Sequence, residues 1–204
     1  MKEIYIIRHG ETDLNKRGIV QGRGIDSDLN QTGINQANAF YNTYKHIKFD
    51  HIYVSNLKRT QQTVQKFIDN GIAYTKLSGL DELAWGIWEG QPVTEKSQQA
   101  FKEIAEKWLN GNYDAKFDLG ESPNEVSIRL QDALFKILSN KNEERILVCM
   151  HGRALRLFLC LLEKKPLSSM IDYPHKNTTL YKLLYDGKSF KIVDFNSTTH
   201  LDLI

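Results

Sequence analysis

The chain has 204 residues, of which 41% are hydrophobic and 25% are charged, and its formal net charge is +2. This composition is that of an ordinary globular domain with a sizeable core, and it excludes a disordered or fibrous protein. Lysines and arginines are scattered among acidic residues and form no basic stripe, so we expect no nucleic-acid partner. We expect one domain over residues 1–204.

The first residues lack the pattern of a targeting or membrane-spanning segment. Only Lys2 precedes an apolar run at 4–7, which Arg8 interrupts well short of a signal-peptide core or a membrane span. We therefore expect a cytoplasmic protein with no membrane partner. Cys149 and Cys160 lie in apolar stretches and are expected to be buried, and no Cys-x-x-Cys or His-Glu-x-x-His spacing predicts a metal site.

Strand-like and helix-like segments alternate along the chain. Segments rich in β-branched and aromatic residues occur at 4–7, 51–55, 74–77, 145–150, 179–185 and 190–195. Between them, helices are predicted to end near 44, to cover 57–69, to run from 122 to 137, and to follow 152. Asn30 or Thr32 is the expected cap of the first helix, Asn56 begins the second, and Ser122 with Glu125 forms a capping box. Alternation of this kind predicts an α/β fold with a mainly parallel sheet.

The pattern loosens between 85 and 120, where glycines are frequent and a short helical piece covers about 98–109. We expect an insertion above the edge of the sheet that shapes access to a substrate, because loops on a rigid scaffold carry specificity. Its aromatic residues, Trp85, Trp88, Phe101 and Trp108, are expected mainly to pack the insertion itself.

Two predicted strands end in the same way, in a histidine followed by a glycine. The first runs into Arg8-His9-Gly10, and the strand 145–150 runs into His151-Gly152. In α/β sheets, ligands bind beyond the carboxyl ends of the strands, so these side chains are expected to share one edge. Arg59, in the first turn of the helix after 51–55, is expected at this edge too. The combination predicts a site for an anion, and we interpret the anion as a phosphate.

These residue types suit phosphoryl transfer. Arg8 and Arg59 can hold phosphate oxygens in a bidentate way. His9 is the expected nucleophile, since a neutral imidazole attacks well when a backbone carbonyl holds its other ring nitrogen. His151 would flank the phosphoryl group and stabilise it electrostatically. No metal and no cofactor is required, and a metallohydrolase built on His9, His151 and Glu82 is disfavoured because Arg8 would repel a divalent cation.

A carboxylate follows the strand 74–77 and supplies the proton that a leaving alcohol needs. Glu82 is the expected donor, because a nearby phosphate dianion favours the protonated carboxyl. The same group could later activate the water that hydrolyses a phosphohistidine. Its neighbour Asp81 is the alternative.

As an ordered set, the motifs resemble the histidine phosphatase superfamily, also called phosphoglycerate mutase-like. The similar segments are residues 8–15 (Arg-His-Gly-Glu-Thr-Asp-Leu-Asn), Gln21-Gly22, 29–37, Ser55-x-Leu57-x-Arg59-Thr60-x-x-Thr63, Glu82 with Gly86-x-Trp88-Glu89-Gly90, Gly120-Glu121-Ser122 and His151-Gly152. The resemblance implies a three-layer α/β/α sandwich with a phosphorylated His9 and a phosphate pocket of Arg8, Arg59 and His151. It also implies that Glu82 is the proton donor. By the same resemblance, Asn15, Gln21, Gly22 and Gly152 line the phosphate or substrate side of the pocket.

Within that family, the spacing Gly86-x-Trp88-Glu89-Gly90 resembles broad-specificity and α-ribazole phosphatases more than cofactor-dependent mutases. The mutases hold the phosphoglycerate carboxylate with a tyrosine, a lysine and a tandem arginine pair. Here the first two positions carry Trp85 and Val93, and no arginine occurs between Arg59 and Arg129. We therefore expect a metal-independent phosphatase whose partner is a small-molecule phosphate ester. A phosphoglycerate mutase and a non-catalytic phospho-ligand or protein-interaction module remain alternatives, and neither the physiological ester nor the oligomeric state follows from the sequence.

Overall fold

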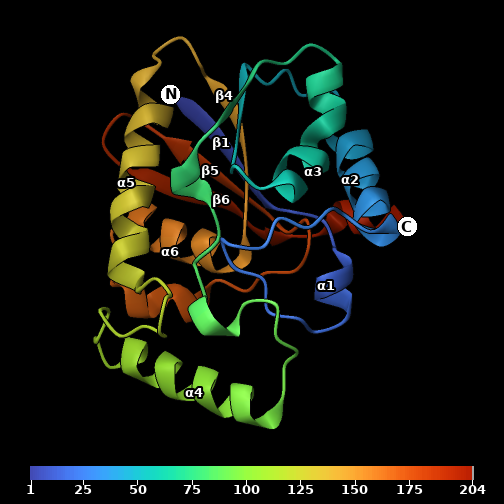
Figure 1. The fold of residues 1–204 in the computed structure, drawn as a ribbon. Coiled ribbons are helices and arrows are strands. Elements are labelled where there is room, and N and C mark those ends of the chain that lie inside the picture. Colours follow the sequence, from blue (N-terminus) through green and yellow to red (C-terminus); the bar gives the residue numbers. More distant parts are fainter. Residues whose placement is uncertain (204) are drawn as a thin grey trace.

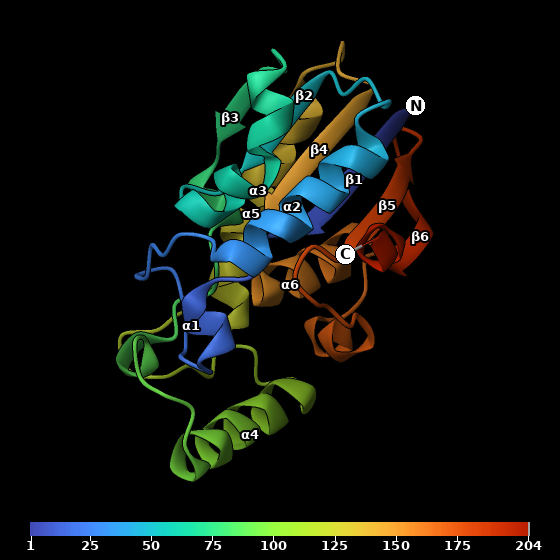
Figure 2. The same cartoon turned by 90° about the vertical axis from the view of Figure 1, so that its right-hand side faces the viewer.

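The computed structural model describes residues 1–203, and within them a six-stranded sheet forms the centre of the molecule (Figures 1 and 2). The strands are β1 (Lys2–Arg8), β2 (His51–Val54), β3 (Tyr74–Lys76), β4 (Arg145–Met150), β5 (Leu180–Tyr185) and β6 (Phe190–Ser197), in the order β3-β2-β4-β1-β5-β6. The first four strands are parallel, whereas β5 runs antiparallel to β1, and β6 antiparallel to β5. The predicted α/β fold with a mainly parallel sheet is confirmed.

Helices cover both faces of the sheet. They are α1 (Asp13–Lys16), α2 (Gln31–Tyr44), α3 (Lys58–Asp69), α4 (Glu95–Leu109), α5 (Pro123–Ser139) and α6 (Gly152–Leu162), with short 3-10 turns at Ser78–Leu80, Gly86–Trp88, Leu167–Asp172 and Thr199–Leu203. α2 and α3 lie on one face, and α5 and α6 on the other (Figure 2). This arrangement is the three-layer α/β/α sandwich that the resemblance implied. Within the described residues, no helix combines the length and the apolar character that crossing a membrane requires.

The alternation of side chains along β1 explains why this strand is apolar throughout. Ile4 and Ile6 belong to the core beneath α5 and α6, whereas Tyr5 and Ile7 belong to the core beneath α2 and α3. Successive residues of a strand point to opposite faces, so a sheet covered on both faces requires a continuous apolar run. The run ends at Arg8 because β1 leaves the covered part of the sheet there, and a polar side chain is then tolerated.

Two of the expected helix caps are present. Asn30 caps α2, with its side-chain oxygen accepting the backbone N–H of Gly33 at 2.9 Å. Ser122 and Glu125 form the predicted capping box at the start of α5. Each cap satisfies backbone N–H groups that have no partner within the helix.

The prediction that Asn56 begins the next helix was wrong. α3 begins at Lys58, and its N-cap residue Leu57 makes no side-chain capping bond. The backbone N–H of Lys58, the first residue of α3, instead donates to Asp26 Oδ1 at 2.7 Å, so a carboxylate from a distant loop takes the place of a local cap. α4 also begins earlier than expected, because Thr94 forms a capping box at its start.

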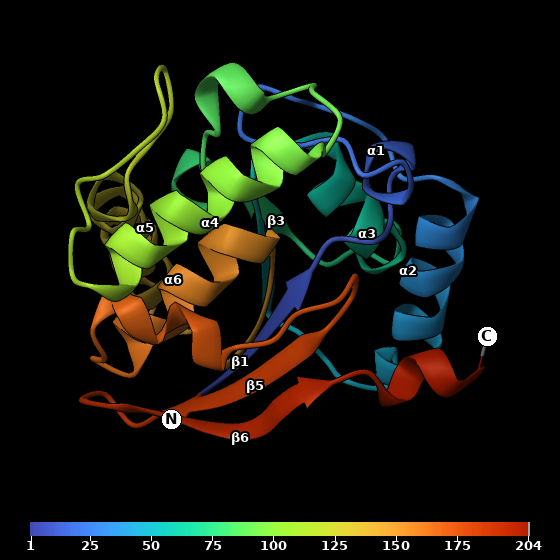
Figure 3. The ribbon, with the colours of Figure 1, turned by 90° about the horizontal axis from the view of Figure 1, so that it is seen from below.

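The segment 85–120 lies beyond the carboxyl ends of the parallel strands. Figures 1 and 3 show α4 at this end of the molecule, lying over α6. The ring of Trp85 packs against Phe101 with centroids 5.0 Å apart, and Phe101 packs against Phe117 at 5.2 Å. The expectation that these aromatic residues mainly pack the segment is confirmed.

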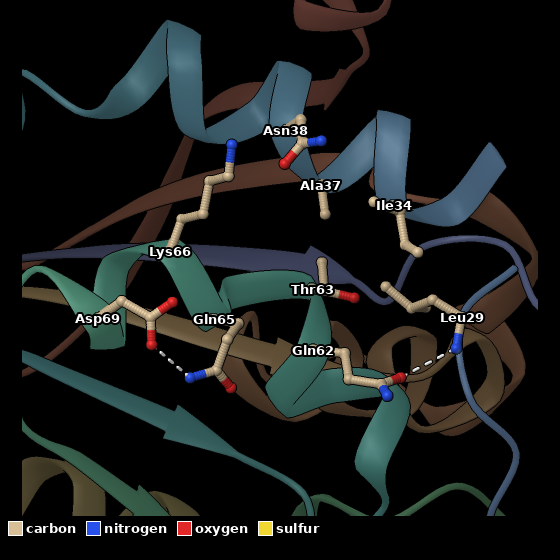
Figure 4. Close-up of a pocket in the computed structure, with 9 residues that line it drawn as sticks. All are labelled: Leu29, Ile34, Ala37, Asn38, Gln62, Thr63, Gln65, Lys66 and Asp69. Atoms are coloured by element: carbon tan, nitrogen blue, oxygen red, sulfur yellow. Dashed lines mark hydrogen bonds between the residues drawn. The ribbon is translucent and has the colours of Figure 1, made fainter. Parts of the chain in front are cut away.

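α2 and α3 enclose a groove of about 340 Å³ on the outer face of their layer (Figure 4). Leu29 and Ile34 line one side, and Gln62, Thr63 and Lys66 line the other. The side-chain oxygen of Gln62 accepts the backbone N–H of Leu29 at 2.9 Å, which ties α3 to the loop that precedes α2. The groove contains none of the sequence-predicted site residues.

The first turn of α2 touches the loop after β1 through backbone atoms. A Cβ atom on Gly33 would lie 2.1 Å from the carbonyl oxygen of Glu11, and one on Gly10 would lie 2.7 Å from the carbonyl oxygen of Gly33. Glycine at both positions is therefore what allows the loop that follows His9 to sit against the helix.

We predict that Gly33→Ala lowers the free energy of unfolding by about 1 to 3 kcal/mol, because the added methyl group pushes the Glu11 backbone away. An alanine inside a helix ordinarily stabilises by about 0.5 to 1 kcal/mol relative to glycine, so the sign of the change tests the contact. Urea denaturation would measure it. Asn35→Ala on the exposed side of α2 is the control, and an unchanged or stabilised Gly33→Ala protein would contradict the account.

Candidate active site

The pairing of β1 with β4 brings the two histidines together. Arg8 pairs with Met150, and the backbone N–H of His9 donates to the carbonyl of Met150 at 3.0 Å. His9 follows β1 and His151 follows β4, so the two histidines lie side by side, with ring centroids 5.1 Å apart. Their exposed fractions are 3% and 0%, so the pair is nearly enclosed by protein.

His9 is arranged as a nucleophile. Its Nδ1 lies 2.7 Å from the carbonyl oxygen of Gly10, so this nitrogen carries the proton and donates it, and Nε2 keeps its lone pair. Asn177 donates its amide to the carbonyl of His9 at 3.0 Å and steadies the backbone there. Burial, together with the nearby Arg59 and Arg8 cations, holds the pKa of His9 well below its usual range. The backbone carbonyl bond expected for this histidine is confirmed.

Two guanidinium groups border the histidines without a carboxylate partner. Arg59 is 1% exposed, and it donates from Nε to His151 Nδ1 at 3.2 Å and from Nη1 to the carbonyl of Ile25 at 2.6 Å. Arg8 donates from Nη1 to His175 Nδ1 at 3.2 Å, and its buried Nε has no hydrogen-bond partner among the described residues. Within residues 1–203, neither arginine takes part in a salt bridge.

Burial lowers the pKa of Arg8 to about 10, and it also lowers the pKa of Arg59, yet both groups stay protonated at neutral pH. Burying a charge that makes no ion pair is unfavourable, and the Glu82 carboxylate offsets this only partly for the two guanidiniums. An anion that accepts hydrogen bonds from both would stabilise them further. The pair is therefore built to receive an anion.

His151 is fixed in one orientation. Its Nδ1 accepts the hydrogen bond from Arg59, so its Nε2 carries the proton and donates to Ser55 Oγ at 2.7 Å. Ser55 is buried and lies 3.0 Å from the hydroxyl of Thr60, which anchors it to α3. Burial, followed by the Arg59 cation, keeps the pKa of His151 far below its ordinary value.

Glu82 sits at the N-terminus of α6, beside His151. Its carboxylate accepts the backbone N–H groups of Arg153 at 3.1 Å and Ala154 at 2.9 Å. The adjacent Asp81 turns the other way and accepts the backbone N–H of Asn56 and the Nε of Arg23. Of the two carboxylates that the sequence left open, Glu82 is the one next to the histidines.

An ion pair holds the backbone that carries Glu82. Arg129 on α5 binds Glu121 through two hydrogen bonds of 2.9 Å, and its other N–H groups donate to the carbonyls of Gly79, Asp81 and Glu82. The Glu121 carboxylate in turn accepts the backbone N–H of Ala84 at 3.0 Å. Arg129 and Glu121 therefore fix the loop from both sides of Glu82.

The structure places Asn15 and Gln21 in the loops around the site. Asn15 completes the capping box of α1, with its Oδ1 accepting the backbone N–H of Thr12 at 3.3 Å and the amide of Asn177 at 3.4 Å. Gln21 donates to the Thr12 hydroxyl at 2.7 Å and accepts from Ser27 at 2.5 Å. The Asn15 side chain thus holds loop backbone, and the Gln21 side chain links the hydroxyls of Thr12 and Ser27.

The two glycines at the site allow close contacts. A Cβ on Gly22 would lie 1.9 Å from Glu89 Oε1, whose carboxylate also accepts the backbone N–H of Trp85. A Cβ on Gly152 would lie 2.8 Å from the ring of His175. Gly152 is therefore what lets His175 pack against the start of α6.

Sequence reasoning assigned no role to His175 and did not consider Asn177. Both lie in the irregular segment before β5, and one contacts Arg8 while the other contacts His9 and Asn15. Burial, with Arg8 next in importance, lowers the pKa of His175 to about 3. No spacing in the sequence marks these residues, because only the fold returns this loop to the end of β1. Within residues 1–203, no group of three or more His, Cys, Asp or Glu side chains is placed to hold a metal ion.

The sandwich and its edge define an α/β protein in which two histidines lie beside two guanidiniums that form no salt bridge within residues 1–203. The chain belongs to the histidine phosphatase superfamily, since the family model for Histidine phosphatase superfamily (branch 1) matches residues 4–198. Members of this superfamily, phosphatases and mutases, are enzymes.

Particular relatives cover almost the whole chain. A protein named probable phosphoglycerate mutase GpmB, from Yersinia pestis (strain Pestoides F), is 30% identical over 100% of this chain and 96% of its own length. Phosphoserine phosphatase from Entamoeba histolytica, solved in complex with 3-phosphoglyceric acid, is 28% identical, with a TM-score of 0.84 over 98% of this chain and 100% of its own. The α-ribazole phosphatase from Shigella flexneri is 24% identical, with a TM-score of 0.84 over 96% of each chain, and confirms the fold.

We predict that Arg129→Met lowers the free energy of unfolding by about 3 kcal/mol, because three backbone carbonyls lose their donor and the half-buried Glu121 carboxylate keeps only the Ala84 N–H and the longer Arg23 contact at 3.4 Å. Lys116→Met is the matched control, since Lys116 forms an ion pair with Glu125 in which both side chains are exposed. That substitution should change stability by less than about 1 kcal/mol. Chemical denaturation of both variants checks the difference, and equal effects would contradict the role given to Arg129.

We also predict that stability falls as the pH is lowered from about 7 to about 5. The pKa of His175 is about 3 in the folded protein and near 6.5 when unfolded, so in this range the unfolded chain binds a proton that the folded chain does not. His9 and His151 act in the same direction. Each such histidine contributes a slope of up to about 1.4 kcal/mol per pH unit.

Urea denaturation at several pH values, in buffers without phosphate, measures that slope. His175→Gln should make the dependence shallower by about 1 kcal/mol per pH unit. His46→Gln, at an exposed position outside the site, serves as the control. An unchanged slope in His175→Gln would contradict the assignment of a neutral, partly buried imidazole.

Proposed function

We propose that the protein is a phosphatase that hydrolyses small phosphate monoesters through a phosphohistidine on His9, without a metal ion. The observation that supports this most strongly is the pair of guanidiniums, Arg59 buried and Arg8 partly buried, which form no salt bridge within residues 1–203 and flank a neutral imidazole. Such a pair can hold a phosphoryl group and spread its negative charge while the imidazole attacks.

In the first half-reaction, Nε2 of His9 attacks phosphorus and forms a P–N bond. The bond from phosphorus to the ester oxygen breaks, and protonated Glu82 gives its proton to the departing alkoxide. Gly10 keeps the other ring nitrogen of His9 in hydrogen-bonded contact, so the nucleophile does not rotate. Arg8, Arg59 and His151 surround the phosphoryl oxygens in this scheme.

In the second half-reaction, the carboxylate of Glu82 accepts a proton from a water molecule, whose oxygen attacks phosphorus. The P–N bond breaks, inorganic phosphate is released, and His9 and Glu82 return to their starting states. One carboxyl group serves both steps because the alcohol leaves from the position at which the water arrives. The Glu82 carboxylate accepts the backbone N–H groups of Arg153 and Ala154, in the first turn of the helix that His151 begins. This position supports the double role.

The relatives support a small phosphate ester as the substrate, and they also suggest a second candidate function. The phosphatase at 28% identity was solved with phosphoserine and with 3-phosphoglyceric acid, and both are monoesters of small carboxylic acids. The relative at 30% identity carries the name of a mutase, so interconversion of 2- and 3-phosphoglycerate is the second candidate. A coupled assay for that interconversion decides between them: release of phosphate without interconversion supports the phosphatase.

We predict that His9→Ala abolishes turnover of every ester, and that full activity of the intact protein persists in the presence of a chelator. Glu82→Gln should reduce kcat by about 10²-fold or more on an alkyl phosphate and less on p-nitrophenyl phosphate, whose leaving group needs little protonation. Asp81→Asn should lose less than about tenfold on either ester. A larger loss in Asp81→Asn than in Glu82→Gln would move the acid to Asp81.

A further inference from the structure

Arg153, at the start of α6, is a third cation without a carboxylate partner. Its guanidinium carbon lies 5.5 Å from the ring centroid of Trp85 and 5.5 Å from that of Trp108. Its one side-chain hydrogen bond within residues 1–203 runs from Nη1 to the sulfur of Met170 at 3.5 Å, and none of the salt bridges there includes it. Aromatic rings thus hold the guanidinium in place and leave most of its N–H donors available.

This cation lies next to the point where a leaving group would depart. The backbone N–H of Arg153 donates to Glu82 Oε2 at 3.1 Å, so the backbone of Arg153 is in direct contact with the group proposed to protonate the leaving alcohol. The side chain is only partly exposed, and burial lowers its pKa to about 10, which still leaves it charged at neutral pH. The guanidinium is close enough to the Glu82 carboxylate for the two charges to interact.

His175 borders the same space from the other side of the α6 N-terminus. Its Nδ1 accepts the hydrogen bond from Arg8, so Nε2 carries the proton, and this N–H makes no hydrogen bond within the described part of the chain. The ring packs on Gly152, which separates His151 from Arg153 along the chain. Next along α6, Arg156 donates to the carbonyl of Tyr173 at 2.9 Å and adds a further positive charge. Glu82 is the acidic group that faces this set.

We propose that Arg153, with His175, forms a second anion subsite that binds a carboxylate carried by the leaving group, so that the preferred substrates are monophosphate esters of small hydroxy acids. A carboxylate fits a single guanidinium because its two oxygens match two parallel N–H donors. The subsite adjoins Glu82, so the carboxylate must be only a few atoms from the ester oxygen. This inference rests on the proposed phosphatase function, and it assigns the substrate class that the motifs left open.

Matched pairs of esters test the subsite. O-phosphoserine differs from O-phosphoethanolamine, and 3-phosphoglycerate from glycerol 3-phosphate, by the carboxylate. The wild-type protein should show kcat/KM at least about tenfold higher for the carboxylate member of each pair. A higher value for fructose 1,6-bisphosphate than for either carboxylate ester would overturn the carboxylate assignment in favour of a second phosphate.

Arg153→Leu should lower kcat/KM for 3-phosphoglycerate at least about tenfold more than for glycerol 3-phosphate, mainly through KM. Arg153→Lys keeps the charge but loses the planar pair of donors, so it should fall between the two. Lys165→Leu is the control, because Lys165 also lies over an aromatic ring, that of Tyr173 at 5.3 Å, at the other end of α6. It should leave the preference within about twofold of wild type. Thermal denaturation of each variant verifies that it folds.

Equal losses on both members of a pair in Arg153→Leu and Arg153→Lys would overturn the subsite and leave the phosphatase intact. An intact protein that hydrolyses every ester without preference would do the same. Absence of turnover on any ester would instead overturn the proposed function, and the subsite with it.

Discussion

The register between β1 and β4 is the constraint on which the site depends. Because the strands are parallel and Arg8 pairs with Met150, the residues that follow, His9 and His151, emerge side by side at one edge. A slip of one residue would turn the side chains of β1 to the opposite faces and place Arg8 where His9 now lies. β2 extends the same logic, since Val54 pairs with Cys149 and the following Ser55 meets His151. The rigid sheet therefore sets the geometry of the histidines, and the loops add to it.

The electrostatics at this edge follow from two arginines that lie in the protein interior and form no salt bridge within residues 1–203. The fold holds Arg8 and Arg59 beside two imidazoles that burial keeps uncharged. It also places the Glu82 carboxylate against the backbone N–H groups of the first turn of α6. Neutral acceptors hold the guanidiniums in place: the carbonyl of Ile25 binds Arg59, and the ring of His175 binds Arg8. Two such guanidiniums can bind an anion, and an uncharged imidazole next to it is a competent nucleophile. These features are the ones that the proposed phosphoryl transfer requires.

Much of this could be predicted from the sequence, because local rules govern it. The apolar run that stops at Arg8, the His-Gly pair after β4 and the capping box at Ser122 each depend on neighbouring residues. His175, Asn177 and the placement of Arg153 could not be predicted, since each depends on a loop or ring brought close only by the fold. The error at Asn56 has the same origin: Asp26, distant in the chain, accepts the first N–H of α3 in place of a local cap. Tertiary contacts overrode local preference at the positions nearest the site.

The central claim is that a phosphoryl group passes through His9, and trapping that intermediate tests it most directly. The protein is mixed with a rapidly hydrolysed ester, quenched in alkali within the first turnovers, digested and sequenced by mass spectrometry. The account predicts an acid-labile phosphate on the ring of His9, which accumulates further in Glu82→Gln with a good leaving group because hydrolysis is slowed more than transfer. Turnover by the intact protein with no phosphate on His9, or with phosphate on His151 instead, would contradict it.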